Sequence, residues 1–240
     1  RLSAAKINGK LLAPGEVFSF NDTVGERTRE AGYKEAHTYV AGKIVDGIGG
    51  GICQVSTTLY NAVLLSDLEV VRRSNHQFTV GYVPYGRDAA VSFPDLDFKF
   101  KNSTKWPLKI VCNVTSNNVI NFSLVGKNDT PTKEVIINTK IVKTIEPTVK
   151  TIKDPTMNEG TTSVNKSGAK GYVVDTYKIV KIDGKEVKNT KIHTSSYNPQ
   201  TREVKVGTKK VPATKEEPNP PKKPGAIIQN IDDSNSNFQP

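Results

Sequence analysis

The sequence predicts two folded regions of different class: an α+β N-terminal domain, with a helix packed on an antiparallel sheet, and a small all-β C-terminal module. Two observations carry this prediction. Residues 1–128 combine one clear helical pattern with several strand-like runs, whereas residues 133–211 contain only strand-like runs rich in Val, Ile, Thr and Lys. The 14 prolines and 18 glycines among 240 residues also favour strands and turns over a helical bundle.

The elements of the first domain follow from local patterns. Pro14-Gly15 predicts a turn before a short strand at 17–20, where aromatic and polar residues alternate. Residues 54–65 predict a helix, because their apolar positions gather on roughly one face. Further strands are predicted at 69–72, 78–83, 89–93 and 108–114. In the last of these, the period of two places Cys112 beside aliphatic residues, which favours an inert core cysteine.

The second region and the tail differ in composition. The Asp183-Gly184 pair lies between two strand-like runs and predicts a tight hairpin turn, since both positions tolerate a positive φ. His193, among Thr and Ser residues, is predicted to be exposed. Residues 212–240 are rich in Pro, Asn and Ser, which is typical of a linker or a disordered tail.

Charge and hydropathy restrict the classes of partner that the sequence predicts. No uncharged apolar run approaches the roughly 20 residues of a membrane helix, so no integral membrane segment is predicted. The net charge is +10, and residues 129–212 carry 16 basic and 9 acidic side chains. Their lysines alternate with Thr and Val and lack interleaved aromatic residues, so nucleic acid is not a predicted partner. An anionic polymer such as a bacterial wall suits this surface.

The most informative segment is a glycine run, Gly-Ile-Gly-Gly-Gly-Ile-Cys-Gln at 47–54, directly before the predicted helix. Such a turn aims free helix N–H groups at one point and can bind an anion. A nucleotide is disfavoured, because neither a P-loop nor a dinucleotide fingerprint is present. The run instead exposes Cys53 at a helix N-terminus, where the partial positive charge stabilises a thiolate.

A nucleophilic cysteine needs a base and a group that orients the base, and both residue types follow in the chain. The order of Cys53, His76 and Asp88 is that of transglutaminase-like and papain-like cysteine enzymes, an analogy at the level of fold. It predicts Cys53 as nucleophile, His76 as base and Asp88 as orienter. The Cys53 N–H could then donate to an oxyanion. The remaining predicted oxyanion or pocket residues are Gln54, Gly50, Gly51 and Asn75.

The alternative interpretation is structural. Cysteine is among the most buried residue types, so Cys53 could simply pack a glycine-rich turn, with His76 as a satisfied polar residue. The three histidines are dispersed and give no metal-ligand spacing, so the sequence predicts neither a metal site nor a cofactor.

Several segments of the first domain together form a specific pattern: Asn8-Gly9, Pro14-Gly15-Glu16-Val17-Phe18-Ser19-Phe20-Asn21, Gly25-Glu26-Arg27-Thr28, Gly32-Tyr33, Gly49-Gly50-Gly51-Ile52-Cys53-Gln54-Val55-Ser56-Thr57-Thr58-Leu59-Tyr60-Asn61, Arg73-Ser74-Asn75-His76 and Gly86-Arg87-Asp88-Ala89. This pattern runs through nearly all of residues 1–126 and resembles the VanW-like family of bacterial surface proteins. The resemblance implies an exported envelope protein, mostly of Gram-positive bacteria. The family takes its name from an accessory gene of vancomycin-resistance clusters, and no settled activity comes with it.

Residues 133–211 resemble the G-five domain, a β module named for its glycines. The landmarks are Gly160, Gly168, Gly171, Thr176-Tyr177, Gly184 and Val206-Gly207-Thr208. The resemblance implies adhesion to wall polymers, with N-acetylglucosamine as the ligand proposed for the family.

Together these features predict an extracellular, cell-wall-associated protein whose first domain acts on or binds peptidoglycan while the second module tethers it. As an enzyme it would be a Cys-His-Asp amidase, peptidase or transpeptidase, with hydrolysis and transpeptidation both open. The alternatives are a non-catalytic peptidoglycan-binding or structural envelope protein, and a signalling ectodomain.

Overall fold

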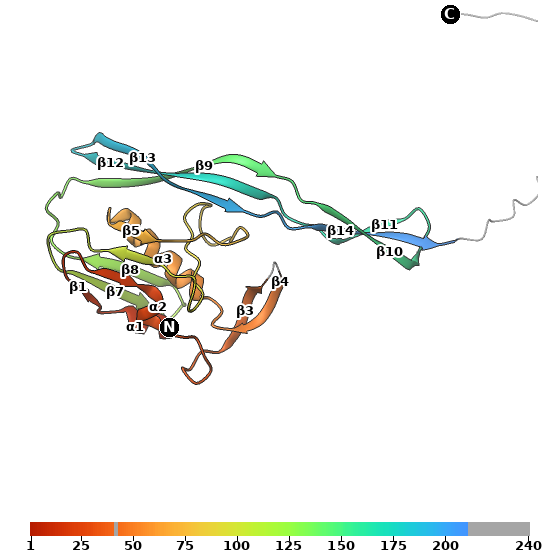
Figure 1. Ribbon diagram of the computed structural model, residues 1–240, viewed down its shortest axis with the longest axis horizontal. Helices are drawn as coiled ribbons and strands as arrows, with labels where there is room; N and C mark the ends of the chain where they lie inside the picture. The colour runs from red at the N-terminus through yellow and green to blue at the C-terminus, as the bar shows by residue number, and fades with distance from the viewer. Residues whose placement is uncertain (41–42, 211–240) are drawn as a thin grey trace, which may run out of the picture.

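The computed structural model describes residues 1–40 and 43–210, so the predicted tail at 212–240 lies outside the described residues (Figure 1). The first region contains the elements α1 (Leu2–Ile7), β1 (Leu11–Leu12), β2 (Val17–Ser19), α2 (Phe20–Val24), β3 (Glu35–Val40), β4 (Lys43–Ile48), α3 (Ile52–Leu65), β5 (Glu69–Arg72), β6 (Lys99–Lys101), β7 (Leu108–Val114) and β8 (Ile120–Val125). The second contains β9 (Glu134–Ile145), β10 (Val149–Asn158), β11 (Thr162–Lys166), β12 (Gly171–Ile182), β13 (Lys185–Tyr197) and β14 (Arg202–Lys209).

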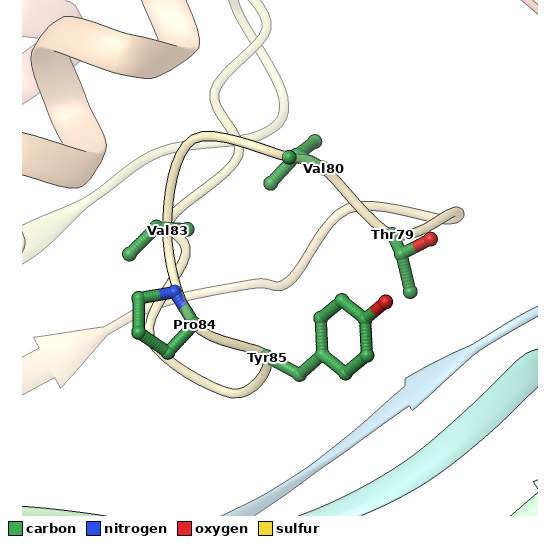
Figure 2. A pocket seen from close by; sticks show the side chains of 6 residues that line it. Thr79, Val80, Val83, Pro84 and Tyr85 are labelled. Carbon is green, nitrogen blue, oxygen red and sulfur yellow. The ribbon is translucent and has the colours of Figure 1, made fainter.

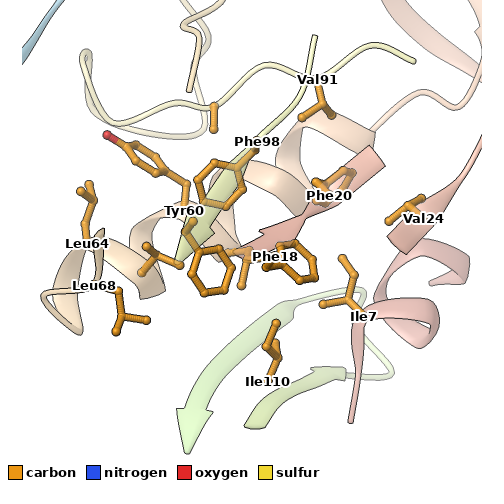
Figure 3. Packing of buried hydrophobic residues seen from close by; sticks show 14 of the residues in the cluster. Ile7, Phe18, Phe20, Val24, Tyr60, Leu64, Leu68, Val91, Phe98 and Ile110 are labelled. Atoms are coloured by element: carbon orange, nitrogen blue, oxygen red, sulfur yellow. The ribbon is translucent and has the colours of Figure 1, made fainter. Parts of the chain in front are cut away.

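The core of the first region surrounds the buried side of α3 (Figure 3). The ring centroid of Phe100 in β6 lies 5.1 Å from that of Phe18 in β2 and 5.9 Å from that of Phe98. Tyr60 of α3 meets Phe98 edge-on at 5.5 Å. These rings are 0–1% exposed, so apolar burial fixes where α3 lies and where its first turn points.

The predicted α+β domain, with α3 on one antiparallel sheet, is wrong. The described part of the first region has only short helices and small sheets, in the orders β1-β7-β8, β2-β6-β5 and β3-β4. The predicted strands at 78–83 and 89–93 are irregular. The backbone at 87 and 89 is bonded by hydroxyls and an amide of α3, and the Ala90 N–H bonds the Ser74 carbonyl, whereas residues 78–83 form a loop that has no strand partner among the described residues. Alternation of apolar residues therefore misled the prediction there.

The second region contains only strands among its described residues, in two sheets of order β13-β12-β9 and β10-β14-β11. Asp183 and Gly184 turn the chain between β12 and β13 with φ of 51° and 74°, as their sequence predicts. β14 pairs parallel with β10 and antiparallel with β11. In Figure 1 the sheet of β9, β12 and β13 covers the first region, and the other sheet continues away from it.

The sheet of β9, β12 and β13 packs on α3. Ile137 of β9 belongs to the core cluster of the first region, and Ile192 of β13 packs against it. His193, predicted to be exposed, is half-buried here, and its Nε2 lies 2.7 Å from the Tyr60 hydroxyl. Burial and the charge of Arg73 lower the pKa of His193 to about 4, so this imidazole is neutral between the two regions.

An ion pair and a close backbone approach complete this contact. Lys178 of β12 bonds Asp67, after α3, at 2.6 Å. Gly86 has a φ of +84° and lies directly against Thr176 of β12, whose hydroxyl donates to the Gly86 carbonyl at 3.2 Å. A Cβ at position 86 would collide with that hydroxyl, so glycine is needed both for the backbone angle and for the contact.

We therefore expect Gly86→Ala to lower the free energy of unfolding by about 1–3 kcal/mol through strain and overpacking. Gly81→Ala in the same loop is the matched control, because its Cβ would meet nothing within 4 Å and its φ is not positive. Urea unfolding of both variants measures the difference. Equal midpoints for the two variants would show that this contact does not contribute to stability.

Candidate functional site

Cys53 lies in the first turn of α3. Gly51 precedes the helix as its N-cap with φ +85°, so the chain enters the helix through a left-handed turn. The N–H of Ile52 bonds to the Gly49 carbonyl at 3.2 Å, and that of Gln54 bonds to the Gly51 carbonyl at 3.1 Å. In the described part of the chain the N–H of Cys53 has no protein acceptor. It is thus available to a substrate oxygen next to the thiol.

The Ser56-Thr57-Thr58 run in α3 has poor helix propensity, but two of its side chains form hydrogen bonds that hold a neighbouring segment. Ser56 donates to the Ala89 carbonyl at 2.6 Å, and Thr57 accepts from the Ala89 N–H at 3.0 Å. Asn61 donates to the Arg87 carbonyl at 2.9 Å. These side chains stand in for a paired strand and hold residues 87–91 along α3. Asp88 is thereby fixed beside the helix that carries Cys53.

The Asp88 carboxylate is 1% exposed and accepts four hydrogen bonds. Oδ2 accepts from the His76 backbone N–H at 2.7 Å and from His76 Nδ1 at 2.6 Å. Oδ1 accepts from Arg73 Nη2 at 2.9 Å and from the Tyr197 hydroxyl at 2.5 Å. Burial alone would raise the pKa of Asp88, but the bonds from His76 and Tyr197 and the charge of Arg73 lower it. Asp88 is therefore a carboxylate acceptor.

His76 is oriented by this carboxylate. Because Nδ1 donates to Asp88, Nε2 is left to face the site, with the Tyr82 hydroxyl 3.4 Å away. Burial alone would lower the pKa of His76, but the hydrogen bond to Asp88 and the nearby Cys53 sulfur, together with the charges of both residues, raise it to about 9. At neutral pH the imidazole is protonated, which is the partner that a thiolate requires.

The Cys53 thiol is half-buried, and its Sγ lies 3.5 Å from the Val91 carbonyl. It also lies close enough to His76 to raise that pKa. A neutral thiol can donate to the carbonyl, whereas a thiolate can accept from His76. A hydrogen bond joins His76 to Asp88, and Cys53 lies near His76; the roles predicted for the three residues stay a prediction.

Arg27 adds positive charge on another side of Cys53. Its Nη2 bonds Asn21 Oδ1 at 2.8 Å, and its guanidinium carbon lies 5.5 Å from the centroid of the Phe20 ring. Burial lowers the pKa of Arg27, while the charges of Tyr33, Cys53 and Asp97 act against this shift. A guanidinium remains charged in proteins, so Arg27 favours an anion at Cys53.

A loop after His76 covers one side of the site. Its residues 79–85 curve around an open cavity of about 400 Å³ (Figure 2). Tyr82 lies in this loop and meets the His76 ring edge-on, with centroids 6.3 Å apart. Partial desolvation is the main cause that raises the pKa of Tyr82, although this residue is 43% exposed, so its hydroxyl keeps its proton beside His76 Nε2.

The other predicted pocket residues lie in different settings. Gly50 and Gly51 line a cavity of about 570 Å³ on the outer side of the glycine run. The Gln54 side chain is exposed at the helix start. The amide of Asn75 is already engaged, since it donates to the carbonyls of His76 at 2.8 Å and Ser196 at 2.7 Å. Their role in binding an oxyanion stays a prediction.

Sequence reasoning missed several groups around the site: Arg27, Arg73, Tyr82, Ser195 and Tyr197. The first two lie in the segments that carry the family resemblance, so those segments could have suggested them. Nothing in the sequence connects residues 195–197 with residue 88, since 109 positions separate Tyr197 from Asp88.

Within 1–40 and 43–210, His, Cys, Asp and Glu side chains do not gather into a group of three that could hold a metal ion. No helix in these ranges has the length and apolar character needed to cross a membrane.

We expect an NMR titration of His76 to give a pKa near 9, well above the ordinary value of 6.5. Cys53→Ala should lower this pKa, because it removes a neighbouring negative charge, and Asp88→Asn should lower it, because the carboxylate that accepts from Nδ1 is gone. His193 is the internal control, with its low pKa unchanged in Cys53→Ala. A His76 that titrates near 6.5 in the wild type would contradict the arrangement.

Comparison with known proteins agrees with the family resemblance. Residues 1–125 match the VanW-like protein family, and residues 136–209 match the G5 domain. The uncharacterized protein YoaR of Bacillus subtilis (strain 168) is 50% identical over 109 residues, which is 45% of this chain and 36% of that protein. The vancomycin B-type resistance protein VanW of Enterococcus faecalis (strain ATCC 700802 / V583) is 32% identical over 125 residues, 50% of this chain and 46% of that protein.

The match spans less than half the length of each of these relatives. Among solved structures, the G5 domain of an IgA1 protease is 25% identical with a TM-score of 0.23, and it covers 34% of this chain and 99% of its own. Both matched families are typical of bacterial cell-envelope proteins. Because the first match covers more than half of the 240 residues, the chain belongs to the VanW-like protein family and carries a G5 domain after its VanW-like region.

Proposed function

We propose that this chain is an extracellular, cell-wall-associated acyl-transfer enzyme, which uses Cys53, His76 and Asp88 on an amide bond of wall peptides. The G5 region holds it to wall glycan in this proposal. The observation that carries the proposal is the buried Asp88 carboxylate, which orients a protonated His76 beside a cysteine at a helix start. A histidine that only stabilised the fold would not need to face a thiol.

The arrangement accounts for each step of acyl transfer. The Cys53 thiolate attacks the amide carbon, and the developing oxyanion accepts from the free N–H of Cys53. His76 gives its Nε2 proton to the leaving amine as the C–N bond breaks, which leaves a thioester. Neutral His76 then takes a proton from water or from an acceptor amine as that group attacks the thioester. The thiolate leaves and the imidazolium is restored.

Arg27 and the helix N-terminus support the anionic states in this sequence. Both place positive charge next to Cys53, and neither donates a proton that would neutralise the thiolate. Hydrolysis and transpeptidation differ only in the group that attacks the thioester, so both belong to the proposal.

The G5 region supports the glycan part of the proposal through its shape and charge. Its second sheet, of β10, β14 and β11, continues beyond the first region (Figure 1). Strands β10 and β14 of this sheet expose lysine side chains. An extended, solvent-exposed and basic strand surface is suited to bind an anionic polymer that carries hydroxyl groups.

We expect Cys53 to be the reactive thiol. At pH 7, iodoacetamide should modify Cys53 faster than Cys112, because burial raises the pKa of the Cys112 thiol and Cys53 faces positive charge. Cys53→Ala should abolish release or transfer of wall peptides, measured by mass spectrometry of digested peptidoglycan, while the matched Cys112→Ser retains it. Activity that survives in Cys53→Ala, or a Cys53 modified only after denaturation, would favour the non-catalytic binding protein.

We also expect the inactive Cys53→Ala chain to sediment with purified peptidoglycan. Sugar recognition by hydrogen bonds should persist at about 0.5 M NaCl, where the Debye length is far shorter than at physiological salt. Loss of binding at that salt would show attraction by charge alone and reject specific glycan recognition. Bovine serum albumin in the same tubes controls for trapping in the pellet.

A further inference from the structure

We propose that the G5 region is part of the active site, with Tyr197 and Ser195 of β13 as positioning residues for Asp88, and through it for His76. This inference rests on the proposed function of Cys53, His76 and Asp88, and it deepens that proposal. It assigns the G5 region a second role besides wall binding, because the orienting carboxylate is held from that region.

The Tyr197 hydroxyl bridges two groups of the first region. It donates to Asp88 Oδ1 at 2.5 Å and accepts from the Gly86 N–H at 2.7 Å. Tyr197 is 1% exposed, so no bulk water can replace this hydroxyl. The two bonds fix the position of Asp88 relative to the preceding turn.

Ser195 acts on the same carboxylate through Arg73. Its hydroxyl accepts from Arg73 Nη1 at 2.8 Å, and it is fully buried. Arg73, with a side chain only 6% exposed, then reaches Asp88 twice: Nη2 bonds Oδ1 at 2.9 Å and Nε bonds the backbone carbonyl at 2.6 Å. Ser195 and Tyr197 are two positions apart on one strand, so they present their side chains to the same face.

The backbone of β13 is also joined to both neighbours of His76. The Asn75 amide donates to the Ser196 carbonyl at 2.7 Å, and the Asn198 N–H donates to the Gln77 carbonyl at 2.8 Å. The end of β13 is therefore bonded to the segment that carries His76 as well as to the segment that carries Asp88.

Aromatic stacking extends this support to the loop over the site. Tyr85 stacks on Tyr172 of β12 with centroids 5.0 Å apart, and it lies 5.9 Å from the Tyr197 ring. In Figure 2, Tyr85 lies beside strands of the G5 region, in the loop that also contains Tyr82. The loop over His76 is thus held from the same side as Asp88.

Without β13, a buried carboxylate and a buried guanidinium would each lose a hydrogen-bond partner. Such losses are costly, because both groups are charged and shielded from water. The first region supplies the nucleophile, the base and the orienter, but it does not supply all the groups that keep the orienter in place. The arrangement is complete only when the two regions are docked.

The test uses Tyr197→Phe and Ser195→Ala in the full chain. Each should lower kcat about tenfold with little change in KM, and should slow alkylation of Cys53 by a similar factor. The pKa of the Asp88 carboxyl, followed by carbon-13 NMR, should rise in Tyr197→Phe, because the hydroxyl that stabilises the charge is gone. Tyr177→Phe and Thr190→Ala are matched controls on β12 and β13 that remove hydroxyls which do not bond Asp88 or Arg73, and all three readouts should be unchanged.

A double-mutant cycle decides whether Tyr197 acts through Asp88. In an Asp88→Asn background, Tyr197→Phe should have little further effect on alkylation, since the acceptor that it positions is already altered. An equal effect in both backgrounds, or no effect in either, would overturn the inference. Circular dichroism and the unfolding midpoint show whether each variant is folded, and the cycle is measured below that midpoint.

Failure of the proposed reaction would be recognised separately. If wild-type protein lacks any action on wall peptides, the acyl-transfer proposal fails, but alkylation of Cys53 and titration of Asp88 still measure the positioning effect of Tyr197. Conversely, full activity with unchanged alkylation and unchanged Asp88 titration in Tyr197→Phe would keep the reaction and reject the role of the G5 region.

Discussion

The buried carboxylate of Asp88 joins two parts of the molecule that are distant in sequence. It accepts from Arg73 and His76 in the segment that follows β5, and from Tyr197 of the G5 region. A charge with 1% exposure is tolerated only when it is fully hydrogen-bonded, so its four donors must be in place together. Folding of the irregular segment 73–98, docking of β13 and orientation of His76 are therefore linked through one group.

This constraint explains why α3 carries polar residues where a helix would otherwise favour Ala or Leu. Ser56 and Thr57 bind the backbone beside Asp88 with their hydroxyls and keep the irregular segment against the helix. The apolar face of α3, including Tyr60, packs into the aromatic core on its other side. The helix α3 thus positions both the Cys53 thiol and the segment whose Asp88 orients His76. Tertiary contacts offset the modest helix propensity of α3.

The sequence predicted well what depends on neighbouring residues. The helix at 54–65, the strands at 69–72 and 108–114 and the Asp183-Gly184 hairpin all follow from local periodicity and turn chemistry. The class of the first domain was not predicted, because the runs at 78–83 and 89–93 alternate like strands, yet the first forms a loop and the second is bonded in part to side chains of α3. Cys53, His76 and Asp88 could be proposed from residue type and order, whereas Tyr197 could not, since its partner is 109 positions away.

The pairing of β14 with its neighbours also fixes the distance between Tyr197 and the far end of the second sheet. From Tyr197, which touches Asp88, the chain continues into β14, whose eight residues to Lys209 span about 25 Å at the usual rise of a strand. Because β14 is flanked by β10 and β11, this arm cannot shorten without breaking two ladders of hydrogen bonds. In the proposed function, a polymer held at the far end of this arm would present its peptides to Cys53 only from glycan strands a comparable distance away, so the arm would set the reach of the site across the wall.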